Sequence, residues 1–275
     1  MATKKISELD AATTPLTGGE LAEIVQTGAN KRVLVSEFGA PKTGVSFMTP
    51  LGNSNTVHLV GMFLVLTGTG TTANSASTNV HTATRRIEYA VTSASATAVA
   101  GVRTNIQQLH IGDSGSPFGG FNFVARFGPS RGVASNATRR FWAGMTSVGT
   151  APTDVQPSEW ATDGIGVGAD AADTNWHIMH RTGTGTMTKI DTGIAKAYAD
   201  TTEMFELRIA TGPIGTPSVT VTLIRLSDGE TFSSTITTNL PAPTTMLGWQ
   251  IWNSVGGTSS VIGVSVGSVY IQAKY

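Results

Sequence analysis

The side chains that could do chemistry in this chain are carboxylates, imidazoles and indoles, because its 275 residues include no cysteine. A glycosidase needs two carboxylates facing each other across the scissile bond, about 5–9 Å apart. Thirteen Asp and Glu residues follow the first 40 positions, and they form no cluster on one expected strand. Glu203 and Glu206 have an odd separation, so an extended strand would point them to opposite faces. We therefore predict no catalytic residue and no enzymatic activity.

Metal binding is not favoured either. His177 and His180 also have an odd separation, so on a strand they cannot converge on one ion. Asp170 and Asp173 share an expected loop, where they either hold a cation or remain solvated turn carboxylates, and the second reading is favoured. The run Gly-Asp-Ser-Gly-Ser at 112–116 resembles a hydrolase nucleophile context, but its flanks are typical of a turn between strands. We predict no metal site and no cofactor.

Tryptophans are the residues best suited to contact a sugar. Trp160 lies in a polar loop, where a large aromatic ring is either packed down or offered to a ligand. Trp249 and Trp252 have an odd separation, so on one strand they point to opposite faces. One of them must leave the core between the sheets and become available for a subunit contact or a glycan. The candidate glycan-binding residues are Trp160 and Trp252.

Composition excludes several partners. The formal net charge is zero and 13% of residues are charged, so the basic footprint of a nucleic-acid-binding protein is missing. No apolar stretch approaches 18 residues, which argues against membrane insertion. The lack of cysteine fits assembly in a reducing cytoplasm. The paired cations Arg85-Arg86 and Arg139-Arg140 stand at expected strand starts, where they either protect an edge strand or contact an acidic partner.

Short strands must position these residues. Apolar or alternating runs closed by Gly, Asn, Asp, Pro or Thr predict about fourteen of them, at 44–49, 57–66, 85–93, 101–111, 119–127, 139–148, 163–168, 175–181, 186–191, 203–211, 217–226, 231–237, 246–253 and 260–273. Residues 67–84 are expected to form a long loop. Past Gly267 the apolar phase shifts, which predicts a β-bulge. Alternation without βαβ spacing favours an all-β antiparallel sandwich of two large sheets, as in a jelly roll.

The first forty residues are different in kind. Isolated apolar residues stand in a polar coil, and two strand-like runs, Leu21 to Gln26 and Lys31 to Val35, flank Thr-Gly-Ala-Asn, which predicts a hairpin. A segment of this length cannot bury a core of its own. We expect copies of the chain or another protein to complete it.

This segment resembles the N-terminal virion-anchoring segment of bacteriophage tail fibres and tailspikes. The resemblance is carried by Lys5 to Leu9, Ala11 to Thr13, Leu16, Gly18, Glu20, Leu21, Val25, Gln26, Gly28 and Lys31 to Val35. The sequence departs from the pattern at Asp10, where proline is common, and at the additional Pro15. The anchoring residues implied by the resemblance are Ile6, Leu9, Leu16, Leu21, Val25, Val33 and Val35.

A second, more diffuse resemblance covers roughly residues 100–275. The runs 119–127, 140–145 and 175–180 are similar to phage appendage domains of the concanavalin-like lectin fold. Together the two resemblances imply a virion-anchoring module at 1–38, a linker at 39–44 and a lectin-like sandwich at 45–275.

The function that these resemblances imply is a tail fibre or receptor-binding appendage of the virion, assembled in the host cytoplasm. It would form a homo-oligomer, with a trimer expected, bind other virion proteins through residues 1–38, and contact host-surface glycan. Two alternatives stay open. One is a head or tail decoration or fibre protein that reads no receptor, and the other, less favoured, is a polysaccharide depolymerase.

Overall fold

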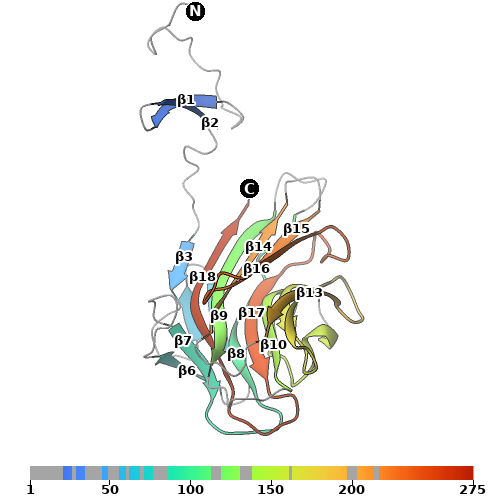
Figure 1. The fold of residues 1–275 in the computed structure, drawn as a ribbon. Coiled ribbons are helices and arrows are strands. Elements are labelled where there is room, and N and C mark those ends of the chain that lie inside the picture. Colours follow the sequence, from blue (N-terminus) through green and yellow to red (C-terminus); the bar gives the residue numbers. More distant parts are fainter. Residues whose placement is uncertain are drawn as a thin grey trace, which may run out of the picture. The chain divides into compact units, whose positions relative to one another are not determined.

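The computed structural model describes two units of the chain, Met1–Gly44 and Val45–Tyr275. The described residues are 21–26, 29–34, 45–48, 56–59, 62–68, 71–76, 86–112, 119–130, 138–160, 163–196, 203–212 and 217–274. Each unit is considered separately below (Figure 1). In this part of the chain no helix is long and apolar enough to cross a membrane.

The first unit contains an antiparallel hairpin. Strand β1 (Leu21–Gln26) pairs with β2 (Ala29–Leu34) from Leu21 opposite Leu34 to Gln26 opposite Ala29. Two residues therefore connect the strands, as in the commonest tight hairpins. The predicted hairpin is confirmed, although its second strand begins two residues earlier than expected.

The second unit is a sandwich of two eight-stranded sheets whose paired strands all run antiparallel. The first sheet has the order β13 (Thr188–Ala195), β12 (Asn175–Arg181), β11 (Gly164–Ala169), β10 (Arg140–Thr146), β17 (Gly248–Ser254), β8 (Val99–Thr104), β5 (Met62–Thr67) and β4 (Thr56–Leu59). The second has the order β16 (Thr231–Ile236), β15 (Val219–Arg225), β14 (Phe205–Thr211), β9 (Phe121–Ser130), β18 (Gly263–Ala273), β7 (Arg86–Val91) and β6 (Thr71–Ala76), with β3 (Val45–Met48) also paired to β18. The all-β sandwich predicted from alternation is confirmed.

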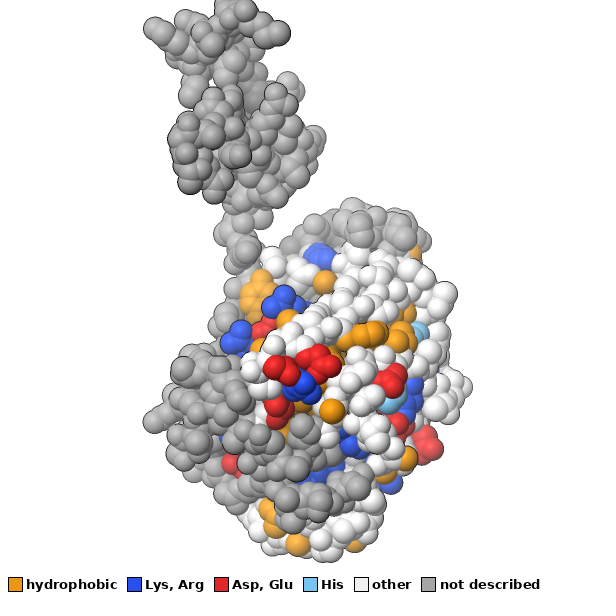
Figure 2. All heavy atoms as spheres, in the orientation of Figure 1, with side chains coloured by type: hydrophobic (Ala, Val, Ile, Leu, Met, Phe, Trp, Pro, Cys, Tyr) orange, Lys and Arg blue, Asp and Glu red, His pale blue; other side chains and the backbone are white. Residues whose placement is uncertain are grey.

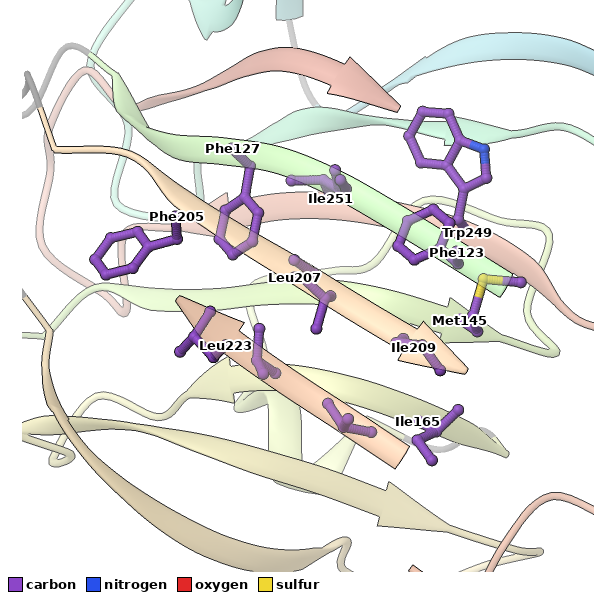
Figure 3. Packing of buried hydrophobic residues seen from close by; sticks show 14 of the residues in the cluster. Phe123, Phe127, Met145, Ile165, Phe205, Leu207, Ile209, Leu223, Trp249 and Ile251 are labelled. Atoms are coloured by element: carbon purple, nitrogen blue, oxygen red, sulfur yellow. The ribbon is translucent and has the colours of Figure 1, made fainter. Parts of the chain in front are cut away.

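Alternating apolar residues of both sheets fill the core between them. Phe205, Leu207 and Ile209 on β14 have at most 1% exposure, as their period-2 pattern predicted. Figure 3 shows them on the same side of the strand, together with Phe123 of β9 and Trp249 of β17. The ring centroids of Phe123 and Trp249 lie 6.4 Å apart, so the two sheets meet directly through aromatic side chains.

The predicted bulge in the last strand is also confirmed. The pairing of β18 with β9 shifts register between Val266 and Ser268, on either side of Gly267. The extra residue changes which side chains face the core, so Val266 and Val269 are both buried although three positions separate them.

Two predicted boundaries were wrong. Strand β6 lies inside the expected loop 67–84, because its sequence Thr-Thr-Ala-Asn-Ser-Ala has no apolar alternation to indicate a strand. The expected strand 57–66 is two strands, β4 and β5, which form a hairpin with Leu59 opposite Met62. Its continuous apolar run concealed the turn.

The paired cations do not protect edge strands. β7, which begins at Arg86, lies between β18 and β6, and β10, which follows Arg139, lies between β11 and β17. Arg139 has no exposed surface and Arg86 only 9%. The edge-strand interpretation is therefore wrong for the three described arginines, Arg86, Arg139 and Arg140, while Arg85 lies outside the described residues.

The two ends of the sandwich carry different loops. Val45 is opposite Ile271 near the end of β18, and we call this the entry end, where Figure 1 shows β3 alongside β18. The far end carries the connections that precede β8, β12, β16 and β18, at residues 92–98, 170–174, 226–230 and 255–262.

Candidate functional site

A second hydrophobic cluster lies on the outer face of the first sheet, away from the core between the sheets. Trp142 of β10 and Trp252 of β17 are directly opposite each other and fully buried. Trp160 packs against both, with its ring centroid 6.1 Å from that of Trp142 and 5.4 Å from that of Trp252, in edge-to-face geometry. Met179 and Met187 complete the contacts. These residues are buried because residues 147–160, here called the covering segment, lie over them.

Strand alternation explains why the tryptophans divide between two clusters. Trp249 belongs to the core between the sheets, whereas Trp252, three positions later, belongs to the outer cluster, as predicted. Glycine supplies the space that the outer rings need. A Cβ added at Gly101 would come within 2.7 Å of the Trp252 Cβ atom and within 2.2 Å of the Ile251 carbonyl oxygen.

The two predicted glycan-binding residues are thus brought together, but inside the protein. Trp252 has no exposed surface and Trp160 retains 8%. Neither ring offers an open face for stacking on a sugar, so the expected exposure of the outward tryptophan is corrected to burial beneath the covering segment. A sugar contact through these two rings stays a prediction, and the sites considered below do not use it.

Polar side chains on the outer face hold the covering segment in place. Gln250 Nε2 donates to the carbonyl oxygens of Val148 at 2.6 Å and Thr150 at 3.2 Å. Arg103 donates to the Gly149 carbonyl, and Arg181 Nη2 donates to that of Trp160 at 2.7 Å. The segment is therefore a fixed third layer over part of the sheet.

Asp154 fixes the segment at the far end. Its carboxylate accepts hydrogen bonds from the backbone N–H groups of Gly256 and Gly257, each at 3.0 Å. It also forms an ion pair with Arg140 Nη1 at 3.0 Å. Both glycines have positive φ, 67° and 88°, a conformation that other residues rarely adopt. Asp154 consequently connects the covering segment to the loop that precedes β18.

A network of charges borders the aromatic cluster. Lys189 Nζ lies 2.9 Å from Asp170 Oδ2 and 2.6 Å from Asp173 Oδ2. Ser158 of the covering segment donates its hydroxyl to Asp170 at 2.6 Å. The cation that pairs with these two carboxylates is thus the ammonium of Lys189. The interpretation as solvated turn carboxylates is therefore wrong, because both side chains are largely buried and paired with Lys189.

Burial and hydrogen bonding shift the pKa values of this network. Burial raises the pKa of Asp170, but hydrogen bonds from Ser158 and Lys189 outweigh it and the net pKa is lowered. For Lys189, burial lowers the pKa and hydrogen bonds to Asp173 and Asp170 raise it, with a net increase. Lys196 donates to the carbonyl oxygen of Asp170 at 2.9 Å, and burial lowers its pKa to about 8.

An exposed carboxylate and a half-buried amide lie beside this network. Asn175 Nδ2 donates to both oxygens of Asp191, at 3.1 and 3.2 Å, and the Gly193 N–H donates to Oδ1 at 2.8 Å. The Gly193 and Asn175 hydrogen bonds lower the pKa of Asp191, so this carboxyl is ionised at neutral pH. His177 Nδ1 lies 3.4 Å from Asp173 on the same face. We call Asn175 and Asp191 the rim pair.

The remaining predicted residues are distributed as follows. Leu21 and Val25 lie on β1 and Val33 on β2, whereas Ile6, Leu9, Leu16 and Val35 lie outside the described residues, as does most of the 112–116 run. His180 is buried and its Nδ1 lies 3.1 Å from the Asn239 carbonyl, which confirms its interpretation as a hydrogen-bonded residue of the sandwich. Among the described residues, no group of three or more His, Asp or Glu side chains is arranged to hold a metal ion.

The rim pair was missed in the sequence because its members are 16 positions apart. Only the register of β12 against β13 brings Asn175 and Asp191 together. The same holds for Lys189 and the two aspartates of the preceding loop. A useful signal would have been the charges on the expected strand 186–191, since charged side chains are common on edge strands.

Comparison with solved structures identifies the class of fold. The sandwich is similar to lectin II from Ulex europaeus, with a TM-score of 0.52 and 16% identity over 85% of this chain and 99% of the lectin. The lectin UEA-II complexed with galactose has a TM-score of 0.51 and 15% identity, over 85% of this chain and 99% of the lectin. Arcelin-5, a lectin-like defence protein from Phaseolus vulgaris, gives 0.51 and 13%, again over 85% and 99%.

These neighbours show a legume-lectin-like, concanavalin-type β-sandwich. At 13–16% identity the likeness concerns the fold alone. No protein-family model matches the chain. No curated protein matches it either.

Proposed function

We propose that this chain is a virion appendage protein whose sandwich contacts host-surface glycans and whose residues 1–38 attach it to the particle. The N-terminal pattern described above supports attachment. The lectin-type sandwich supports glycan contact, since UEA-II, which has this fold, is complexed with galactose. The function is binding, without hydrolysis of the glycan.

The rim pair is the observation that carries the glycan proposal. Sugar hydroxyls are recognised by planar polar groups held in a fixed orientation, and an ionised carboxylate accepts the strongest hydrogen bonds from them. Asp191 is exposed, and the donors from Asn175 and Gly193 fix its orientation before a ligand arrives. Little entropy is then lost when a sugar binds.

The position of the rim pair suits this role. Asn175 begins β12 directly after the far-end loop 170–174, and Asp191 is its neighbour on edge strand β13. The chain enters the sandwich at Val45, at the opposite end of the strands, so the rim pair lies away from the place where β3 joins the second sheet. On the part of the surface that is not grey, Figure 2 shows mainly uncharged polar side chains or backbone, with charges of both signs in a few small groups.

Binding to immobilised sugars tests the proposal. A panel of mono- and oligosaccharides that includes galactose is probed with the full chain and with Asp191→Asn. We expect the variant to bind at least about tenfold more weakly, equivalent to about 1.4 kcal/mol. Asp228→Asn is the matched control, because Asp228 is also an exposed carboxylate and pairs with Arg225 on the second sheet.

Two results would overturn parts of the proposal. If the unmodified chain binds no member of the panel, glycan contact is wrong and the alternative of a decoration or fibre protein that reads no receptor is favoured. The burial of Trp160 and Trp252 is what supports that alternative. If the variant at Asp191 binds normally while the chain itself binds, the rim pair is not the contact.

A further inference from the structure

An apolar surface lies at the entry end of the sandwich. Among the residues whose exposure the structure describes, two large hydrophobic side chains are exposed. Ile106 is 57% exposed and Met246 is 51% exposed. They come from different loops, one after β8 and one before β17. A shallow hollow lies between these loops, lined by Thr104, Ile106, Gln108, Leu109, Leu247, Gly248, Trp249 and Ile271. We call this surface the entry-end patch.

The patch is rigid. Leu109 and Leu247 exchange backbone hydrogen bonds, with N–H to carbonyl distances of 3.1 and 2.5 Å, and the Gln108 N–H donates to the Leu247 carbonyl at 3.1 Å. Leu247 and Trp249, which form the floor, are buried with the core between the sheets. Ile106 and Met246 are therefore exposed from a fixed backbone, an arrangement that suits a preformed interface.

The occupant we infer is a second copy of this chain. Val45 is opposite Ile271, and Ile271 lines the hollow. The 44 residues that precede Val45 thus join the sandwich beside the patch. When several copies attach to one particle through residues 1–38, as the proposed function states, their entry-end patches are held at a high local concentration.

The chemistry of the patch fits contact between copies better than contact with a charged partner. Its lining residues carry no formal charge, and the whole chain has zero net charge, so copies do not repel one another strongly. Exposed Met and Ile side chains around a hollow can fill the same hollow on a neighbour, as closed symmetric assemblies require. We propose that the entry-end patches meet around the symmetry axis of the oligomer.

Site-specific cross-linking tests this contact, because the chain contains no cysteine and one introduced thiol reports one position. Met246→Cys and Ile106→Cys are treated with a short bismaleimide in the full chain. Each reagent molecule joins two thiols and each chain has one, so we expect covalent dimers from both variants. We expect none from the control Ser93→Cys, which is exposed at the far end. A homo-oligomer without cross-links at 106 or 246 overturns the inference, and so does a monomer at micromolar concentration.

Charge substitution provides the second measurement. Met246→Asp should reduce the mass in light scattering or weaken association at least about tenfold, equivalent to about 1.4 kcal/mol, whereas Ser93→Asp should not. Both positions are exposed, so thermal melting serves to verify that each variant folds. If Met246→Asp assembles like the unmodified chain, the inference is contradicted.

Sugar binding separates this inference from the function on which it rests. If Met246→Asp assembles normally while Asp191→Asn loses sugar binding, the patch assignment fails and the glycan proposal stands. If Met246→Asp dissociates but no sugar binds, the patch assignment stands and the glycan proposal fails. When both are correct, the dissociated variant keeps binding at each site and loses the gain from multiple copies.

Discussion

Lys196 shows how one buried charge affects this sandwich. Its ammonium donates to the carbonyl oxygens of Asp170 at 2.9 Å and Arg139 at 3.3 Å, so it connects two loops at the far end. These hydrogen bonds compensate only in part for lost hydration. The pKa of Lys196 consequently falls from 10.5 to about 8.

The shift gives a pH dependence with a definite sign. Between pH 8 and the unfolded pKa of 10.5, the unfolded chain holds a proton on Lys196 that the folded chain has released. The free energy of unfolding therefore receives a contribution that increases with pH across this window. Urea unfolding of the unmodified chain and of Lys196→Met, from roughly pH 7 to roughly pH 10, isolates this contribution as their difference.

Lys189 does not contribute to the pH dependence of stability in this window. Its pKa is raised, so its own loss of charge occurs above the same window. We expect the difference in stability between the unmodified chain and Lys196→Met to change in favour of the unmodified chain as pH rises. A difference that is constant over the window would contradict the assigned burial of the ammonium.

The residue patterns predicted correctly which face of a strand a side chain occupies. They did not predict which distant residues it contacts. The odd separation of Trp249 and Trp252 correctly placed them on opposite faces, because pleating is a local property of the backbone. It did not predict that Trp252 would be covered, since Trp160 is distant in the sequence and reaches it only in the folded chain. Asp170 and Lys189 likewise meet only through the pairing of β11, β12 and β13.

At the scale of elements, the covering segment is the feature that distinguishes the two faces of the first sheet. Its backbone is held by side chains of the sheet beneath, and Asp154 holds it to the loop 255–262. Local openings of a protein follow such boundaries between cooperative units. The strength of the Asp154 contacts should thus determine how often this segment opens.

Asp154→Ala should loosen the segment selectively. The change removes an ion pair with Arg140 and leaves the N–H groups of Gly256 and Gly257 without their acceptor, at a cost of about 1–3 kcal/mol. Hydrogen exchange should become faster across residues 148–160 and remain unchanged in β14 and β15. Glu159→Ala, at an exposed position on the same segment, is the control and should have little effect. Uniform acceleration over the whole sandwich would contradict the local role.

Strands were predicted where their composition resembles that of a half-buried sheet. The alternation in β14, β15 and β9 and the phase change at Gly267 revealed both the strands and the bulge. Strand β6 was missed because its hydroxyl and amide side chains are typical of a loop, and pairing with β7 overrides that preference. The order of the strands in the two sheets has no local signal.

At the scale of the whole molecule, the proposal assigns separate tasks to the two units. The sandwich has its own core, made entirely of residues beyond 86 among those described as buried. Deletion of residues 1–38 should therefore leave its melting temperature within a few degrees of that of the full chain. We expect the truncated chain to bind the sugar panel weakly and to be absent from particles.

Particle incorporation is the measurement that decides the role of this segment. Virions grown with the truncated chain as the only copy should lack it in a protein gel or in images of the particle. Normal incorporation would show that residues 1–38 are not the anchor. A truncated chain that unfolds would instead show that the two units are not independent.

The pairing of β3 with β18 also has a mechanical consequence. The chain enters at Val45 and β3 runs antiparallel to β18 through four residue pairs, from Val45 opposite Ile271 to Met48 opposite Ser268. A pull on Val45 along the strand direction, as the proposed attachment through residues 1–38 would produce, loads these hydrogen bonds together in shear. They then share the tension and must break almost simultaneously. Because β18 is bonded to β9 over most of its length, the load passes into the middle of the second sheet and not to an edge strand.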